Sequence, residues 1–465
     1  MRSEKTPMQR QAVMADNNAL ILGLAGFGTV GTGLARILEE NRAEILARTG
    51  RDIRIKTVLV RDASKKRPHL PADALLTTDM NALVTDPAID VVVELMGGVD
   101  EPGRLIRAAL NAGKHVVTAN KALLAETGNE LFALAAEKGL HLGYEASVCG
   151  GIPVVQTLRE SLAGNRIEGL AGILNGTSNY ILSEMTTEGL AFDVALKQAQ
   201  ELGYAEADPT LDIEGFDAAH KLALLIRIAW GVVYPYDQLP VQGISSVKPE
   251  DILFAREFGY RIKLVGHARL VGGNLAEGGG IEAGVCPTLV HSTFLLARVG
   301  GAYNALRVEG NAIGSVFLHG KGAGDMPTGS AVAADILAIA RGGAINNTGF
   351  ANPVLPVPAR VIPAREASSH YYIRMKVTDE PGVLRDIAAI MADNGISIAQ
   401  VIQKDRAGNH PPVEQNGKAK SPCVPFIVMT HEAPAAGVEK ALATLAASSM
   451  VHEPPVHYRV MAKKG

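Results

Sequence analysis

The chain has 465 residues, of which 47% are hydrophobic and 20% charged, enough for about two to four domains with sizeable cores. Its 45 Lys and Arg residues against 48 Asp and Glu residues give a net charge of −3, too near neutral for an electrostatic grip on nucleic acid or an anionic membrane. Three scattered cysteines and the lack of a long apolar run or signal peptide predict a cytoplasmic protein that binds a small molecule.

Strands alternate with helices along the first 150 residues, after a short N-terminal tail at 1–18. Strand-like runs follow the first glycine-rich segment at 53–60, 90–98, 115–120 and 141–148, and helical patterns lie between them at 101–113 and 128–139. This alternation predicts an α/β domain at 19–150, with a parallel sheet covered by helices, the Rossmann-type layout that hosts nucleotides.

A glycine loop, GFGTVG, joins the first apolar strand to a helical pattern. Gly26 permits a tight turn, Gly28 lets the backbone approach a pyrophosphate, and Gly31 lets helix and strand pack closely. The unpaired N–H groups at the helix start then attract the phosphates. The loop therefore predicts a dinucleotide site.

The end of the second strand bears on the choice of dinucleotide. Arg61 comes first, Asp62 second, and the basic run 65–67 follows. A basic residue suits the 2′-phosphate of NADP, whereas an acidic one suits the ribose hydroxyl of NAD. NADP is favoured, NAD stays open, and a solvated basic loop is the alternative without a ligand.

Longer helices and glycine-broken strands replace this alternation from about residue 151. They predict an α+β domain with an open sheet at 151–317. The proline-rich run at 346–368 reads as a linker, and a strand, helix and strand within 370–404 begin a separate C-terminal domain at 369–465.

Two lysines are the catalytic candidates. Lys121 follows the strand at 115–120, at the sheet edge where ligands bind, although it could also be a surface lysine at a helix start. Lys221 ends an acidic run, EADPTLDIEGFDAAHK, and begins an apolar helix with Asp217 four residues earlier. A helix N-terminus with one salt bridge explains part of this charge. The rest suits a substrate with an amino group and an oxygen that needs a proton.

Cys149 and Glu145 lie in the turn after the predicted strand at 141–148. A thiolate at a helix start could attack an aldehyde, but free cysteine is more often an inert apolar residue. Glu145 and the neighbouring carbonyl groups could bind a hard cation through oxygen atoms.

These residues resemble those of homoserine dehydrogenase over nearly the whole chain. The matching segments include GLAGFGTVG, VVTANKALLA, YEASVCGGIPVV and GILNGTSNYIL. The run AQELGYAEADPTLDIEGFDAAHK, residues 199–221, fits the family signature without a gap. The segment DEPGVLRDIAAIMADNGISI resembles an ACT domain, a ferredoxin-like module that often binds amino acids.

The resemblance implies reversible reduction of L-aspartate 4-semialdehyde to L-homoserine with NADPH or NADH, in threonine and methionine biosynthesis. Lys221 would donate the proton with Lys121 beside it, Glu206 and Asp217 would hold homoserine, and Asp212 would support the site. The positions that would contact the cofactor are Gly26, Phe27, Gly28, Thr29, Val30, Gly31, Arg61, Thr118, Lys121, Gly203 and Gly322.

The resemblance also implies a monovalent-cation site, with sodium expected, at Glu145, Val148, Gly150 and Ile152. The segment at about 318–345 would return the chain to the cofactor domain, and 151–317 would be the catalytic and dimerisation domain. A homodimer or homotetramer is expected. Threonine feedback through the ACT domain stays open, because a polar loop after residue 403 interrupts it.

Two alternatives remain at this point. One is a phosphorylating semialdehyde dehydrogenase that acts through Cys149. The other is an NADP-binding amino-acid sensor without catalysis, which the intact Lys221 segment disfavours.

Overall fold

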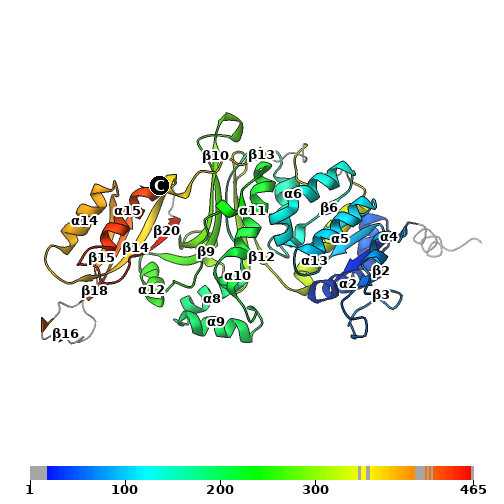
Figure 1. Ribbon diagram of the computed structural model, residues 1–465, viewed down its shortest axis with the longest axis horizontal. Helices are drawn as coiled ribbons and strands as arrows, with labels where there is room; N and C mark the ends of the chain where they lie inside the picture. Colours follow the sequence, from blue (N-terminus) through cyan, green and yellow to red (C-terminus); the bar gives the residue numbers. More distant parts are fainter. Residues whose placement is uncertain are drawn as a thin grey trace, which may run out of the picture.

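The structure is a computed structural model that describes residues 18–343, 347–351, 357–403, 414–415, 418–419 and 423–461. The molecule is elongated, with a parallel sheet at one end, a large open sheet in the middle and a smaller helix-covered sheet at the other end (Figure 1). Within the described ranges, none of the helices has both the length and the apolar character needed to cross a membrane.

The first sheet has six parallel strands in the order β3-β2-β1-β4-β5-β6, the Rossmann order. Its strands are β1 (Leu20–Ala25), β2 (Ile53–Leu59), β3 (Leu75–Thr77), β4 (Val91–Glu94), β5 (His115–Thr118) and β6 (Leu142–Gly143). Helices α2 (Thr29–Glu40), α3 (Arg42–Thr49), α4 (Asn81–Thr85), α5 (Asp100–Asn111) and α6 (Lys121–Glu137) connect them. The strand order reverses beside β1, which is where such sheets bind ligands.

A later helix, α13 (Asp325–Ala340), packs against α2 and so rejoins this first sheet. The two helices approach so closely that a Cβ at Gly33 would lie 2.1 Å from the carbonyl oxygen of Asp325. A Cβ at Gly329 would likewise lie 2.8 Å from the backbone nitrogen of Leu34. Small residues at this crossing therefore let α13 complete the covering of the sheet.

One predicted strand is mostly wrong. The run at 141–148 forms only the two residues of β6, and a 3₁₀ turn follows at Glu145–Ser147. The backbone N–H of Glu145 donates to Asp335 Oδ2 at 2.8 Å, and its carboxylate accepts from the N–H groups of Val155 and Gln156. These bonds draw the chain out of the sheet, a long-range effect that strand-like residues cannot signal.

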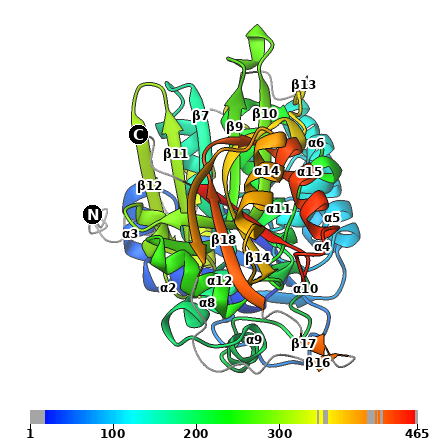
Figure 2. The same ribbon diagram turned by 90° about the vertical axis from the view of Figure 1, so that its left-hand side faces the viewer.

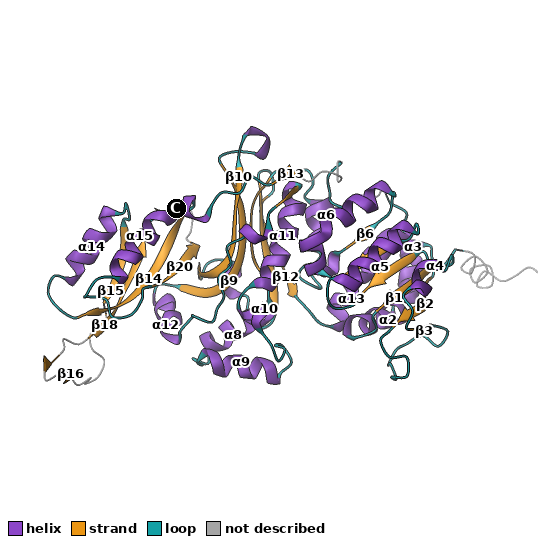
Figure 3. Cartoon of the chain, viewed as in Figure 1, coloured by secondary structure: helices purple, strands orange, loops and turns teal. Residues whose placement is uncertain are grey.

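The second sheet has ten strands, nine of which follow the order β12-β11-β7-β9-β10-β20-β14-β18-β15. Its central strands are β7 (Ile167–Ile173), β9 (Tyr260–Val271), β10 (Gly280–His291), β11 (Tyr303–Gly310) and β12 (Gly314–Lys321). The helices beside them are α7 (Val154–Gln156), α8 (Gly176–Thr187), α9 (Phe192–Glu201), α10 (Thr210–Ile213), α11 (Phe216–Trp230) and α12 (Pro249–Glu257) (Figure 3). Together they form the expected α+β region with an open sheet.

The C-terminal strands and helices follow the expected βαββαβ order, with the ferredoxin-like strand order β20-β14-β18-β15. They are β14 (Ser368–Thr378), α14 (Val383–Asp393), β15 (Ile398–Gln403), β18 (Cys423–Thr430), α15 (Ala435–Ala446) and β20 (Val456–Met461). These elements face the viewer in Figure 2. Strand β20 also pairs in parallel with β10. The C-terminal sheet is therefore a continuation of the central one.

Ion pairs with buried carboxylates reinforce this junction from both sides of β20. Arg459 donates to Glu282 Oε1 of β10 at 2.6 Å. Arg374 of β14 donates to Asp251 Oδ1 of α12 at 2.6 Å, and Tyr372 donates to the same oxygen at 3.1 Å. Both carboxylates are buried, so a variant that lacks either arginine would leave a buried charge unpaired at a high cost.

The described part of the proline-rich run lies along the central region. Strand β13 (Val357–Pro358) pairs with β8 (Val232–Val233), and Ile281 of β10 donates its N–H to the carbonyl of Arg360 at 2.8 Å. The polar loop after residue 403 lies almost wholly outside the described residues, as does the N-terminal tail up to residue 17.

Candidate active site

Two lysine ammonium groups meet at one buried carboxylate, Asp217. Lys221 Nζ donates to Asp217 Oδ2 at 2.7 Å, one helical turn along α11. Lys121 Nζ lies 3.3 Å from the other oxygen, Oδ1. The structure therefore brings together the two lysines that were predicted from separate segments.

The helices explain this meeting. Asn120 caps α6 by accepting the N–H of Leu123 at 3.1 Å, which places Lys121 in the first turn, just beyond β5. Helix α6 packs against α11. The side chain of Lys221 is 12% exposed and that of Lys121 is 39% exposed, so Lys221 is the more enclosed of the two.

Asn175 holds the acidic side of the site in place. It caps α8 by accepting the N–H of Ser178 at 2.7 Å, and its Nδ2 donates to Asp212 Oδ1 at 2.7 Å and to Asp217 Oδ2 at 2.8 Å. Asn175 was not predicted as a site residue from the sequence, although an Asn directly before a helix is a recognised capping signal. The side-chain amide of Asn175 thus bridges the carboxylates of Asp212 and Asp217.

A backbone carbonyl completes the contacts of Lys221. The oxygen of Leu174 accepts from Lys221 Nζ at 2.7 Å and from Asn304 Nδ2 at 3.0 Å. A Cβ at Gly322 would lie 2.3 Å from the Asn304 side chain, so the Gly322 backbone passes close to this centre. Backbone groups such as this carbonyl carry no side-chain signal, so the sequence does not predict their role.

The charges at the centre support one another. Burial alone would raise the pKa of Asp217, but the two lysines hold it well below its usual range. Burial would likewise lower the pKa of Lys221, but the charge of Asp217 and the hydrogen bond to it raise that pKa. Burial and the neighbouring charge of Asp217 raise the pKa of Asp212. At neutral pH the centre therefore holds a carboxylate and a protonated Lys221.

The other carboxylates of the acidic run have separate places. Glu206 is exposed, and among the described residues no hydrogen bond or ion pair joins its carboxylate to either lysine. Asp208 accepts from the N–H and hydroxyl of Thr210 and so stabilises the turn before α10. Glu214 accepts from the hydroxyl of Ser245 and lies before the helix start.

The glycine loop has the shape that a dinucleotide requires. Gly26 has φ +99°, and a Cβ there would lie 2.6 Å from the carbonyl oxygen of Leu95. A Cβ at Gly31 would lie 2.8 Å from the Gly26 oxygen, whereas the space around Gly28 is open. Phe27 is buried, and Thr29 and Val30 begin α2. A ligand can therefore approach the backbone at Gly28, beside the N-terminus of α2.

The remaining predicted cofactor positions lie on four separate segments. Arg61 lies two residues after the end of β2 and is exposed. Thr118, at the end of β5, is buried and donates to Glu94 Oε2 at 2.5 Å. Gly203 turns the chain after α9 with φ +75°, and the loop there is tied to α8 because Thr177 donates to the carbonyl of Tyr204 at 2.7 Å.

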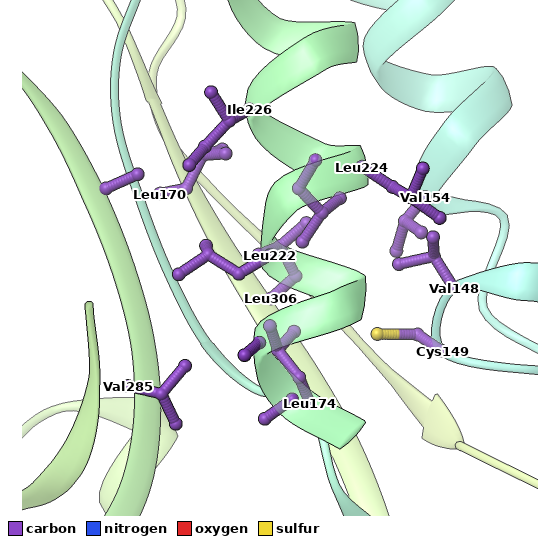
Figure 4. Close-up of a cluster of buried hydrophobic side chains, with 14 of the residues drawn as sticks. Val148, Cys149, Val154, Leu170, Leu174, Leu222, Leu224, Ile226, Val285 and Leu306 are labelled. Atoms are coloured by element: carbon purple, nitrogen blue, oxygen red, sulfur yellow. The ribbon is translucent and has the colours of Figure 1, made fainter. Parts of the chain in front are cut away.

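Cys149 does not have the surroundings of a nucleophile. Its side chain is fully buried in a hydrophobic cluster with Val148, Val154 and Leu174 (Figure 4). Burial raises the pKa of its thiol to about 11, so the thiol stays protonated at neutral pH. This environment supports the interpretation of Cys149 as an inert apolar residue.

The predicted cation site lies in a turn of unusual backbone shape. Cys149 and Gly150 have φ of +56° and +50°, both in the left-handed region. The carbonyl of Ile152 accepts the N–H of Val154 at 2.7 Å, and that of Glu145 accepts the N–H of Val148 at 3.3 Å. Burial, followed by the charge of Glu145, raises the pKa of the adjacent Asp335 to about 7. Hard carbonyl donors near buried acids fit a cation.

The fold and the site together define a nicotinamide-dependent oxidoreductase. The fold is a Rossmann sheet with a glycine loop, and the site has two lysines that contact one buried carboxylate beyond the end of a strand. Family models agree with this class. One described as homoserine dehydrogenase matches residues 153–337, its NAD binding domain model matches 26–145, and an ACT domain model matches 371–409.

Individual relatives give the same assignment. A homoserine dehydrogenase from Pseudomonas aeruginosa is 42% identical over 454 residues, covering 94% of this chain and 98% of the relative. The crystal structure of a homoserine dehydrogenase from Thiobacillus denitrificans is 43% identical, with a TM-score of 0.87 and coverage of 95% and 98%. A hyperthermophilic archaeal homoserine dehydrogenase in complex with NADPH is 27% identical, with a TM-score of 0.59 and coverage of 71% and 99%.

The chain belongs to the homoserine dehydrogenase family. Its activity is the NAD(P)-dependent interconversion of L-aspartate 4-semialdehyde and L-homoserine, and it carries a C-terminal ACT domain. This assignment confirms the family resemblance and sets aside both the phosphorylating dehydrogenase and the sensor without catalysis.

Proposed function

We propose that Lys221 is the proton donor for the substrate oxygen and that Lys121 stabilises the same oxygen. The observation that carries this proposal is the meeting of both ammonium groups at Asp217. A bound nicotinamide would supply the hydride that reduces the aldehyde carbon, and negative charge would then develop on the substrate oxygen. A protonated lysine there neutralises that charge and delivers the proton, a contribution of roughly 10²- to 10⁴-fold.

Asp217 keeps Lys221 charged, and few of its hydrogen-bond acceptor positions remain for the substrate ammonium. A carboxylate offers about four lone-pair positions. Lys221, Asn175 and Lys121 contact its oxygens, leaving about one position on the Oδ1 side for the substrate ammonium. Glu206, which is exposed on the loop tied to α8, supplies the second ammonium contact, and Asp212 supports the site through Asn175.

NADP(H) is the proposed preferred cofactor, held by the glycine loop with Arg61 at its 2′-phosphate. Asp62 favours this choice because its Oδ1 already accepts from the N–H and hydroxyl of Ser64, at 2.9 and 2.6 Å. The exposed basic side chain of Arg61 then remains for the 2′-phosphate. The NADPH bound to the archaeal relative is consistent with this proposal.

A sodium ion is proposed in the turn at Glu145, Val148, Gly150 and Ile152. The left-handed backbone at Cys149 and Gly150 curls the chain, and carbonyl oxygens are the donors that hard cations prefer. The ion would fix the turn that leads into α7, and its proposed role is structural.

The ACT domain is proposed to bind threonine as a feedback inhibitor. Its sheet continues the central sheet through β20, so a change in the ACT domain has a direct structural route to the catalytic region. The proposed division of the chain is a tail at 1–18, a cofactor domain at 19–150 with a return at 318–345, a catalytic domain at 151–317, a linker at 346–368 and the ACT domain at 369–465.

A homodimer or homotetramer in the cytoplasm is the proposed working form. A broad groove crosses the open sheet, with Arg166, Glu168, Arg307 and Glu309 among its lining residues. Charges of both signs on one face suit an isologous interface, in which each patch meets its own copy. Light scattering in solution would test the assembly.

One experiment tests the proposed cofactor preference and the proposed threonine feedback together. Homoserine oxidation is followed with NADP and NAD side by side, with and without threonine. A higher kcat/KM with NADP and inhibition by threonine are expected. Equal use of both cofactors would contradict the role of Arg61, and rates that threonine leaves unchanged would contradict feedback.

A further inference from the structure

A second cavity lies at the C-terminal end of α8, remote from the catalytic lysines. Its volume is about 410 Å³, and its lining includes Ser183 and Thr186 from the last turns of that helix. Asn175, which contacts the active centre, is at the opposite end of α8. With a rise of 1.5 Å per residue, the cavity is roughly 15 Å from Asn175 along the helix.

Lys263 of β9 is a buried cation in the wall of this cavity. It is 5% exposed, and its ammonium donates to Asn179 Oδ1 at 3.0 Å and to the carbonyl of Val299 at 2.6 Å. Both acceptors are neutral, and no ion pair joins Lys263 to a carboxylate within the described chain. Burial, assisted by the charge of Arg261, lowers the pKa of Lys263 to about 8. A buried ammonium without a counter-charge is costly.

Two guanidinium groups add to the same wall. Arg261 lies two residues before Lys263 on β9, and Arg298 lies in the turn after β10. Neither forms an ion pair among the described residues, and Arg298 donates only to the carbonyl of Ser292, at 3.4 Å. The lining residues in the described chain include no carboxylate. Three positively charged side chains therefore line one cavity, and no carboxylate among its described lining residues balances their charge.

A purely structural role accounts for only part of this arrangement. Asn179 donates to the carbonyls of Val299 and Gly301, and Lys263 donates to Asn179, so together they fasten α8 to the turn before β11. That fastening explains Lys263. It does not explain why Arg261 and Arg298 face the same cavity, because neither takes part in it.

We propose that this cavity, named here the Lys263 pocket (Arg261, Lys263, Ser292 and Arg298), binds a phosphate group. A phosphate dianion neutralises more of the three positive charges than a monocarboxylate does, and a guanidinium fork matches its oxygens. The hydroxyl of Ser292 supplies a further donor. The pocket is separate from the proposed cofactor and substrate positions, so the inference does not depend on the proposed catalytic roles.

Calorimetric titration of the full-length chain with inorganic phosphate tests the proposal. Saturating NADP is present throughout, so that phosphate cannot bind in the dinucleotide site, and ionic strength is kept constant. The variants are Arg261→Gln and Arg298→Gln, with Arg48→Gln as a matched control on an exposed helix away from the pocket. Lys263→Met is added, with circular dichroism to check its fold.

Saturable phosphate binding is expected in the wild-type chain, with acetate binding more weakly. Each pocket arginine variant should weaken phosphate binding by about 10-fold, the effect of one charge-assisted hydrogen bond, and Arg48→Gln should leave it unchanged. No saturable binding to the wild-type chain would overturn the proposal. So would equal affinity in the wild-type chain and both pocket arginine variants, or acetate binding as tightly as phosphate.

Discussion

Lys221 lies one helical turn after Asp217 and donates to its Oδ2 at 2.7 Å, within a centre that Lys121 enters from the first domain. The carboxylate therefore links α11 to the start of α6, just beyond β5. The proposed role of Lys221 rests on this contact, and the predictions for Asp217 and Lys221 depend on it.

Asp217→Asn should move the pH dependence of homoserine oxidation to lower pH. In that direction a neutral lysine must accept the hydroxyl proton. Asp217 raises the pKa of Lys221, whereas burial alone would lower it, so removal of the carboxylate charge lowers the pH at which Lys221 becomes neutral. The measurement is kcat against pH for the variant and the wild type. Asp208→Asn, in an exposed turn, is the control, and an unmoved profile would contradict the pairing.

Glu206→Gln should raise the KM for homoserine by about 10-fold, because the substrate ammonium loses one charge-assisted contact. The kcat should change little, since the proton donor is untouched. Steady-state kinetics with varied homoserine measure both. Glu201→Gln is the matched control at the end of α9, and an unchanged KM in Glu206→Gln would rule out the ammonium contact.

Arg61→Ala should raise the KM for NADPH by about 10-fold and leave the KM for NADH nearly unchanged, since only NADPH has a 2′-phosphate. Arg48→Ala serves as the control for loss of a positive charge on the same domain. Equal effects on the two cofactors would mean that Arg61 does not read the 2′-phosphate.

Gly33→Ala should lower the free energy of unfolding by about 1–3 kcal/mol, as overpacking does in a close interface. The added Cβ would lie 2.1 Å from the Asp325 carbonyl oxygen, so α13 must shift away from α2. Thermal unfolding measures the change. Gly164→Ala, where a Cβ meets open space, is the control. Equal Tm values for the two variants would contradict the close crossing.

Local spacing predicted the parts of the site that lie within one helix or loop. The interval of four residues between Asp217 and Lys221 predicted their ion pair, which the structure confirms at 2.7 Å. The glycine loop was recognisable because Gly26, Gly28 and Gly31 lie between an apolar strand and an amphipathic helix. In both cases the sequence itself brings the interacting groups together.

The remaining features of the site and the fold depend on tertiary contacts, which the sequence does not show. The capping amide of Asn175 reaches Asp212 and Asp217 only because α8 lies beside α10, which in turn packs against α11. The pairing of β20 with β10 joins residues more than 150 positions apart, and edge pairing of that kind has no local pattern. Glu145 left the predicted strand because of bonds to Asp335, Val155 and Gln156.

The most direct measurement is the kcat of Lys221→Ala for homoserine oxidation, with the Kd for NADPH measured on the same preparation. Lys197→Ala, an exposed lysine on α9, is the matched control. Loss of a positioned proton donor should lower kcat by at least about 100-fold and leave the cofactor Kd unchanged. Turnover near that of the wild type, with NADPH still bound, would contradict the assignment of Lys221 as the proton donor.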